Sequence, residues 1–391
     1  MDISNIFCTF ALANDKPMIN RYLLPLLESM LSSHKAVILM GARQVGKSTL
    51  LQLLLKGRKD VLWLNGDNQD IQSLFTTVSA ERIRTLMGDK HILVLDEAQR
   101  IPNVGVQLKI IIDQLQDVQV IATGSSSFEL ASKVNEPLTG RKREFKLFPL
   151  SFSELSEHTS LLEELRLIPH RLVYGYYPEV VTSPGQEAVI LKELTDSYLY
   201  RDILTLDKVA KSDKLVLLLK ALAMQIGSQV SYNELSGLVG IDAKTIERYI
   251  TILEQSYIIF RLGSFSRNLR NELKFSKKIY FWDMGIRNAV IGNFSLAENR
   301  VDIGAMWENF AIAERMKQIS YRHPFAQSYF WRTKQQTEID YLEESDGILQ
   351  AFEFKWNTHK NTRCPLAFAN AYPEATFRII TPANIDDFLR L

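Results

Sequence analysis

A short segment with two glycines, a lysine and two hydroxyl residues has the composition of a phosphate-binding loop. Residues 41–48 match the pattern G-x-x-x-x-G-K-[ST], and Thr49 follows them; the segment lies between an apolar run at 36–40 and a helical pattern at 50–55. In such a loop the backbone N–H groups and a helix N-terminus surround phosphate oxygens. Lys47 would contact the β- and γ-phosphates of ATP, and the Ser48 hydroxyl would ligate Mg²⁺. We expect the nucleotide to be held by nine residues: Gly41, Ala42, Arg43, Gln44, Val45, Gly46, Lys47, Ser48 and Thr49.

Two carboxylates follow a later apolar run and supply the groups that hydrolysis requires. Residues 92–95 are Ile-Leu-Val-Leu, and Asp96 and Glu97 come directly after them. Downstream of a phosphate-binding loop, Asp96 would hold the magnesium ion through water, and Glu97 would orient and deprotonate the attacking water. An apolar run followed by two acids is also a common strand end, so the assignment depends on the loop.

A further apolar run at 118–122 ends in small hydroxyl residues, among them Thr123 and Ser125. Either side chain could contact the γ-phosphate, although such residues also suit an ordinary turn. Apolar strand patterns therefore alternate with helical patterns over the first part of the chain. This alternation predicts a three-layer α/β domain at 1–152, with the nucleotide at the carboxyl ends of its strands.

These motifs, taken together, resemble a group of bacterial and archaeal AAA-type ATPases. The resemblance rests on Gly-x-Arg-Gln-Val-Gly-Lys-Ser, Leu-Asp-Glu-Ala-Gln, Thr-Gly-Ser-Ser, Leu-Thr-Gly-Arg-Lys-Arg and Phe-Pro-Leu-Ser-Phe-Ser-Glu. It implies an arginine before the fifth strand that reaches the ATP site of a neighbouring subunit and neutralises phosphoryl charge. Arg141 occupies that place, with Arg143 as the alternative and a basic surface loop as the competing interpretation. An arginine of this kind would make the active form a homo-oligomer.

The sequence of the middle of the chain predicts a helical region at 153–210 and a mixed region of helices and strands at 211–264. Residues 153–210 are helical and mixed in charge, which fits the helical lid of AAA-type proteins. Residues 211–264 predict a helix–turn–helix followed by strands, the pattern of a winged helix that binds DNA. Lys244 and Arg248 would face outward from its second helix. Further basic residues that could contact DNA phosphates follow it: Arg267, Arg270, Lys274, Lys277 and Lys278. A winged helix that serves only packing or subunit contacts is the alternative.

The last region, 265–391, contains a hairpin pattern with acidic residues. Two strand patterns are joined by Glu-Ser-Asp-Gly at 344–347, with Asp340 late in the first strand and Glu353 and Lys355 in the second. This is the pattern of metal-dependent nucleases of the restriction-endonuclease-like fold. Asp340 and Glu353 would ligate Mg²⁺, with Glu308 as an extra carboxylate, and Lys355 would orient water. Ordinary alternation on a half-exposed hairpin is the other explanation. The group named above has a C-terminal region of unknown function with this layout.

Composition restricts the remaining possibilities. The chain has 391 residues, a formal net charge of +1 and two cysteines, so overall charge neither demands nor excludes nucleic acid. No run reaches the ~20 apolar residues that cross a bilayer, and we expect a cytoplasmic protein without a membrane partner. The leading hypothesis is a Mg²⁺-dependent ATPase that remodels or translocates duplex or branched DNA. A nucleotide-gated switch with slow hydrolysis and a DNA-loading ATPase similar to replication initiators remain open.

Overall fold

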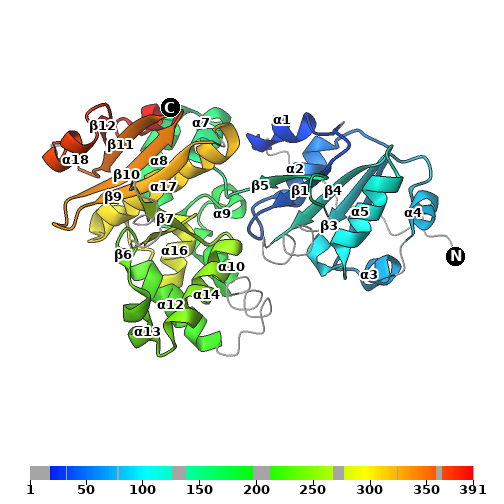
Figure 1. Ribbon diagram of the computed structural model, residues 1–391, viewed down its shortest axis with the longest axis horizontal. Coiled ribbons are helices and arrows are strands. Elements are labelled where there is room, and N and C mark those ends of the chain that lie inside the picture. Colours follow the sequence, from blue (N-terminus) through cyan, green and yellow to red (C-terminus); the bar gives the residue numbers. More distant parts are fainter. Residues whose placement is uncertain are drawn as a thin grey trace.

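The computed structural model describes residues 18–31, 33–76, 79–125, 138–196, 212–266, 277–323, 325–357 and 363–390. Two bodies lie side by side, each built around a sheet of its own (Figure 1). The N-terminal body contains the helices and strands up to residue 146, and the C-terminal body contains those from residue 152 onward. None of the helices within the described ranges is long and apolar enough to cross a membrane.

The N-terminal body is a parallel five-stranded sheet in the order β2-β3-β4-β1-β5. Its strands are β1 (Ala36–Met40), β2 (Val61–Asn65), β3 (Ile92–Asp96), β4 (Gln119–Gly124) and β5 (Lys142–Lys146). Every residue of β1, β3 and β4 is buried. Because alternate side chains of a strand point to opposite faces, this burial requires layers on both faces of the sheet. The predicted three-layer α/β fold is confirmed.

Strand order decides which loops meet at the edge of this sheet. The central position of β4, between β3 and β1, places the carboxyl ends of these three strands next to one another. The helices of this body are α1 (Leu23–Glu28), α2 (Lys47–Leu54), α3 (Gln69–Thr76), α4 (Ala80–Met87) and α5 (Val104–Gln114), with a 3₁₀ turn η2 (Ala98–Arg100).

The C-terminal body surrounds a seven-stranded sheet in the order β12-β11-β10-β9-β7-β8-β6. Its strands are β6 (Gln229–Val230), β7 (Ile259–Ser264), β8 (Lys277–Phe281), β9 (Gln327–Arg332), β10 (Glu338–Ser345), β11 (Ile348–Phe354) and β12 (Thr376–Ile380). Its first helices are α7 (Phe152–His158), α8 (Leu161–Tyr174), α9 (Pro178–Thr182), α10 (Glu187–Leu194) and α12 (Ser212–Met224). The later ones are α13 (Tyr232–Val239), α14 (Ala243–Gln255), α16 (Met284–Ile291), η4 (Ala297–Asn299), α17 (Ile303–Arg322), α18 (Leu366–Ala371) and α19 (Ile385–Arg390).

This sheet crosses the domain boundary that the sequence predicts at 264/265. Strand β7 pairs antiparallel with β8, and it also pairs in parallel with β9 through Gly263 and Ser264. The predicted boundary therefore does not separate two independent sheets. Helices α8 and α10, from the predicted lid at 153–210, pack against α16. The described part of that segment thus belongs to the C-terminal body (Figure 1). Strand pairing between segments so distant in sequence leaves no local signal, so periodicity and composition alone indicate a division at this point.

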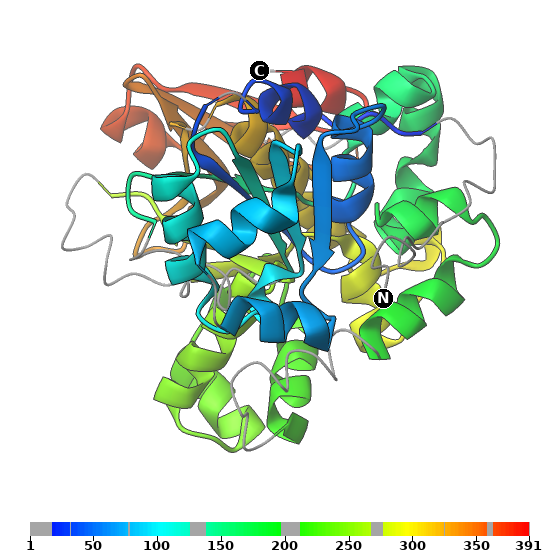
Figure 2. The same cartoon turned by 90° about the vertical axis from the view of Figure 1, so that its right-hand side faces the viewer.

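Helices α13 and α14 have the local signals that the sequence indicated. Gly240 ends α13 in a left-handed conformation with φ 75°, and the Asp242 carboxylate caps α14 by accepting from the Thr245 N–H at 2.9 Å. In both views these helices lie at one end of the molecule (Figures 1 and 2). Lys244 and Arg248 are exposed on α14. Three predicted DNA-contacting residues lie outside the described ranges: Arg267, Arg270 and Lys274.

The two bodies are joined by residues 147–151, which we call the linking segment, and α17 holds this segment with buried polar groups. The Phe148 N–H donates to the Tyr321 hydroxyl at 3.2 Å. The Lys317 ammonium donates to the Leu150 carbonyl at 3.0 Å. Because these groups are buried, leaving any of them unpaired would destabilise the junction.

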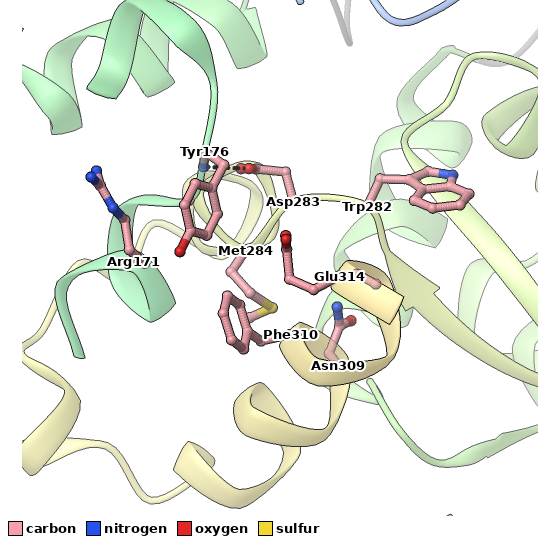
Figure 3. Close-up of a pocket in the computed structure, with 10 residues that line it drawn as sticks. Arg171, Tyr176, Trp282, Asp283, Met284, Asn309, Phe310 and Glu314 are labelled. Atoms are coloured by element: carbon pink, nitrogen blue, oxygen red, sulfur yellow. Dashed lines mark hydrogen bonds between the residues drawn. The ribbon is translucent and has the colours of Figure 1, made fainter. Parts of the chain in front are cut away.

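A small cavity of about 10 Å³ beside α17 has two acidic residues in its wall (Figure 3). Asp283 accepts from the Tyr176 N–H at 2.7 Å, and Glu314 pairs with Lys317 at 2.6 Å. Burial raises the pKa of both carboxyl groups, and the nearby Lys317 ammonium opposes this effect. Lys317 is therefore the cation on which two buried acids depend.

Replacing Lys317 tests that dependence. Lys317→Met removes the cation from a pair whose side chains are 1% and 2% exposed. We expect a loss of about 3–5 kcal/mol in the free energy of unfolding, seen as a fall in Tm of roughly 5–10 °C. The double variant Lys317→Met/Glu314→Gln, which removes both charges, should recover much of the loss. An unchanged Tm for Lys317→Met would contradict this account.

Candidate nucleotide site

The loop between β1 and α2 is folded around the Lys47 ammonium. Gln44 and Gly46 have positive φ values of 58° and 94°, which turn the backbone so that the loop closes on itself. The Lys47 ammonium donates to the carbonyls of Gly41 at 2.9 Å and Ala42 at 2.8 Å. The nine predicted residues form the loop after β1 and the first residues of α2.

Burial affects the charge of this lysine. It lowers the pKa of Lys47 to about 8, and the nearby carboxylates of Glu97 and Asp96 oppose the effect in part. A polyphosphate in the loop would supply further negative charge beside the ammonium and favour its protonated form. The environment of Lys47 is therefore suited to an anionic ligand.

Ser48, Asp96 and Thr123 meet at the carboxyl ends of the three central strands. The Ser48 hydroxyl donates to one Asp96 oxygen at 2.7 Å, and the Thr123 hydroxyl donates to the other. A hydroxyl beside a carboxylate is the kind of oxygen donor set that Mg²⁺ accepts. The residues present fit the magnesium ion that the motif implies, with Ser48 and Asp96 as its holders.

Glu97 follows Asp96 in a conformation that is uncommon for a residue with a side chain. Its backbone is left-handed, with φ 50° and ψ 43°, and such conformations concentrate at functional sites. Its N–H donates to the Thr123 hydroxyl at 3.0 Å. Thr123 therefore positions both acids of the pair in this structure, in addition to its predicted place near the γ-phosphate.

Gln99 is the last residue of the Leu-Asp-Glu-Ala-Gln motif, and the sequence alone assigned it no role. Its amide donates to the Glu97 carboxylate at 2.5 Å and to the Ser125 hydroxyl at 3.0 Å. Gln99 is 2% exposed, so its side chain holds Glu97 and Ser125 in fixed positions. Its place two residues after Glu97 was the available signal.

Arg21 is a second residue that was missed. Its guanidinium donates to the Val45 carbonyl in the loop at 2.9 Å and to the Phe148 carbonyl in the linking segment at 2.6 Å. It also pairs with Glu154 on α7 at 3.1 Å. No motif marks Arg21, because its partners lie up to 133 residues away.

Arg141 lies at the opposite end of the sheet from the loop. Its carbonyl accepts from the N–H of Ala36, the first residue of β1, whereas the loop follows Met40 at the other end of that strand. Its side chain is partly exposed and pairs with Asp113 on α5. Arg143 lies on β5 opposite Val37, also near the start of β1. Neither arginine belongs to the phosphate site of its own chain.

The C-terminal hairpin is confirmed. Strands β10 and β11 are paired up to Ser345 and Ile348, and the two loop residues Asp346 and Gly347 have φ values of 52° and 79°. Two successive positive φ values define the turn type that suits a tight hairpin.

The predicted nuclease residues of this region are engaged with other groups. Asp340 accepts from the Phe354 N–H at 2.9 Å, and Glu353 pairs with Lys355 at 2.7 Å. Burial, with the charges of Glu308 and Glu353, raises the pKa of Asp340 well above its usual range. Across the described ranges, no three acidic, histidine or cysteine side chains are placed to hold a metal ion. The metal site predicted at Glu308, Asp340 and Glu353 is therefore not formed here.

Three family models match successive parts of the chain. Residues 33–156 match an AAA domain, residues 151–297 a domain of unknown function (DUF8612), and residues 303–386 another domain of unknown function (DUF4143). The second match spans the boundary that the sequence predicts at 264/265.

Relatives and solved structures resemble most of the chain. An uncharacterized protein of Haemophilus influenzae is 27% identical over 363 residues, covering 83% of this chain and 84% of the relative. An uncharacterized protein of Mycobacterium tuberculosis is 26% identical over 328 residues, covering 82% and 71%. A Walker-type ATPase of Pyrococcus abyssi is 17% identical, with a TM-score of 0.47, over 71% of this chain and 99% of that one. With the loop geometry above, the match at 33–156 shows that the N-terminal body is an AAA-type P-loop ATPase domain.

Proposed function

We propose that this chain hydrolyses ATP with Mg²⁺ and uses the cycle to act on DNA through its C-terminal body. The observation that carries the hydrolytic part is the connected set of hydrogen bonds joining Ser48, Asp96, Thr123 and Glu97. These residues come from three separate segments, and sheet order brings them to one edge.

Each residue has a distinct task in this proposal. Lys47 binds the β- and γ-phosphates and balances their charge. Ser48 and Asp96 hold Mg²⁺, which offsets phosphate charge when it is bound. Glu97, oriented by Gln99, aligns a water molecule with the γ-phosphorus and accepts its proton. Thr123 keeps the two acids in place, and Ser125 steadies Gln99.

The DNA part of the proposal is supported by α13 and α14. They follow one another through a tight turn and precede the antiparallel pair β7 and β8, as the winged-helix hypothesis requires. Lys244 and Arg248 extend from the exposed side of α14, where phosphate contacts would form. The proposal includes no cleavage step, because the Lys278 ammonium already lies against the Glu308 carboxylate, where a metal ion would have to bind.

A nucleotide-gated switch is the second candidate, and the position of Arg21 favours it. This one guanidinium contacts both the P-loop and the linking segment. A change in the loop on nucleotide binding would therefore reach the C-terminal body without any need for rapid turnover. The two candidates differ in whether DNA changes the rate of hydrolysis.

The first test is ATP turnover by the wild type and by Glu97→Gln at low salt, without DNA and with duplex, single-stranded or four-way-junction DNA. Glu97→Gln should bind ATP and lose roughly 100-fold or more in turnover, because its side chain cannot accept the proton. Stimulation of the wild type by one form of DNA is the expected result. A Glu97-dependent rate that no DNA alters would favour the switch, and normal turnover by Glu97→Gln would refute the assigned role.

Gly66 offers a test of how closely Glu97 must be positioned. A Cβ atom at Gly66 would lie 2.4 Å from the Glu97 carbonyl, so Gly66→Ala must displace the backbone of that residue. We expect turnover to fall by roughly 10- to 100-fold while ATP binding is retained, because displacement of a catalytic group costs rate. Gly237→Ala is the control, since a Cβ there meets no atom within 4 Å. Full activity in Gly66→Ala would contradict the assignment.

Arg141 is tested by mixing two inactive variants. Arg141→Ala should bind ATP normally and lose roughly 1,000-fold in turnover if the arginine completes a neighbouring copy's site. Arg84→Ala is a matched control, because Arg84 also pairs with an aspartate on the surface. Mixing Arg141→Ala with Glu97→Gln should restore activity, since each supplies what the other lacks. A monomer with full activity, or a mixture without recovery, would argue against this role.

A further inference from the structure

Lys278 lies inside the C-terminal sheet, although the sequence placed it among basic residues available to DNA. It belongs to β8 and is 1% exposed. Its ammonium lies 3.1 Å from the Glu308 carboxylate and also pairs with Glu338. It lies 5.5 Å from the centre of the Phe330 ring, which closes another side of its environment. A lysine so placed is unavailable for surface contacts.

The carboxylates around Lys278 have protein partners of their own. Glu308 accepts from the Tyr280 hydroxyl at 2.7 Å and lies close to Gly227, where a Cβ would be 3.2 Å from its oxygen. Glu338 also pairs with Arg332 at 3.3 Å. Two further acids belong to this cluster. Asp340 accepts a hydrogen bond from the Phe354 N–H, and Glu353 pairs with the Lys355 ammonium.

We infer that Lys278 takes the place of a divalent cation in this carboxylate cluster, so that the cluster is neutralised by an ammonium group and holds no metal ion. A magnesium or manganese ion binds through one or two carboxylates beside which there is room for the ion and its water ligands. The ammonium already occupies the space between Glu308 and Glu338, and a second cation beside it would be repelled at short range in a poorly solvated environment. This inference goes beyond the proposed function and does not depend on ATP hydrolysis or DNA binding.

The position of Lys278 in the sheet keeps its side chain there. Strand β8 lies between β6 and β7, and Lys278 is paired with Gln229 on one side and Leu262 on the other. For a metal ion to take this position, the ammonium would have to leave both carboxylates. The cluster therefore carries a fixed internal cation as part of the fold.

The inference is tested by titrating nucleotide-free full-length protein with Mn²⁺. The electron paramagnetic resonance signal of the free ion reports how much Mn²⁺ is bound. The wild type should show no Asp340-dependent site tighter than about 1 mM, the weak end of the range for oxygen-ligand cation sites. Lys278→Met should gain one Mn²⁺ per chain, and adding Asp340→Asn should remove it. A wild-type site that Asp340→Asn abolishes would overturn the inference, and so would a folded Lys278→Met that gains no ion.

Thermal melts provide the second measurement. Without metal, Lys278→Met should melt roughly 5–10 °C below the wild type, and Mn²⁺ should restore much of the difference. If the single variant does not fold, the double variant Lys278→Met/Glu338→Gln is titrated instead. It removes one charge of each sign, and it too should gain one Mn²⁺ per chain. Lys317→Met is the matched control: it loses an equally buried lysine outside this cluster and should gain no ion.

Discussion

The guanidinium of Arg21 connects parts of the chain that the sequence keeps far apart. It donates to a P-loop carbonyl at Val45 and to the Phe148 carbonyl, and it pairs with Glu154 at the start of α7. Burial makes these contacts obligatory, because an unpaired guanidinium at this depth would carry a large desolvation cost. The nucleotide loop and the linking segment therefore have a fixed relative position, and the rest of the structure is built on either side of it.

Helix α17 extends this constraint into the C-terminal body. Lys317 and Tyr321 hold the linking segment, while Glu308, farther toward the helix start, lies beside Lys278 in the seven-stranded sheet. Helix α17 thus contacts both the linking segment and the interior of the seven-stranded sheet. If such a helix moves as a rigid unit, a displacement of the linking segment would also displace Glu308 relative to Lys278 on β8.

Local patterns were sufficient for the P-loop, the acidic pair and the β10–β11 hairpin, because each is specified by residues adjacent in sequence. They failed where the partner is remote. Lys278 looked like a surface cation because its acidic partners Glu308 and Glu338 lie 30 residues or more along the chain. Arg21 gave no signal at all. The boundary at 264/265 failed for the same reason, since the pairing of β7 with β9 is invisible to composition and periodicity.

The shared sheet has a consequence for how this protein could be divided. Cutting the chain after β7 would separate β7 from β8 and β9, and β6 from β8, so that backbone N–H and C=O groups of these strands would lose their partners. Exposed edges of this kind recruit other strands and promote aggregation. Helices α13 and α14 and the acidic hairpin are therefore attached to one continuous sheet. Replacing the segment before or after the cut with that of another protein would disrupt strand pairs in this sheet, whether or not it changed a binding surface.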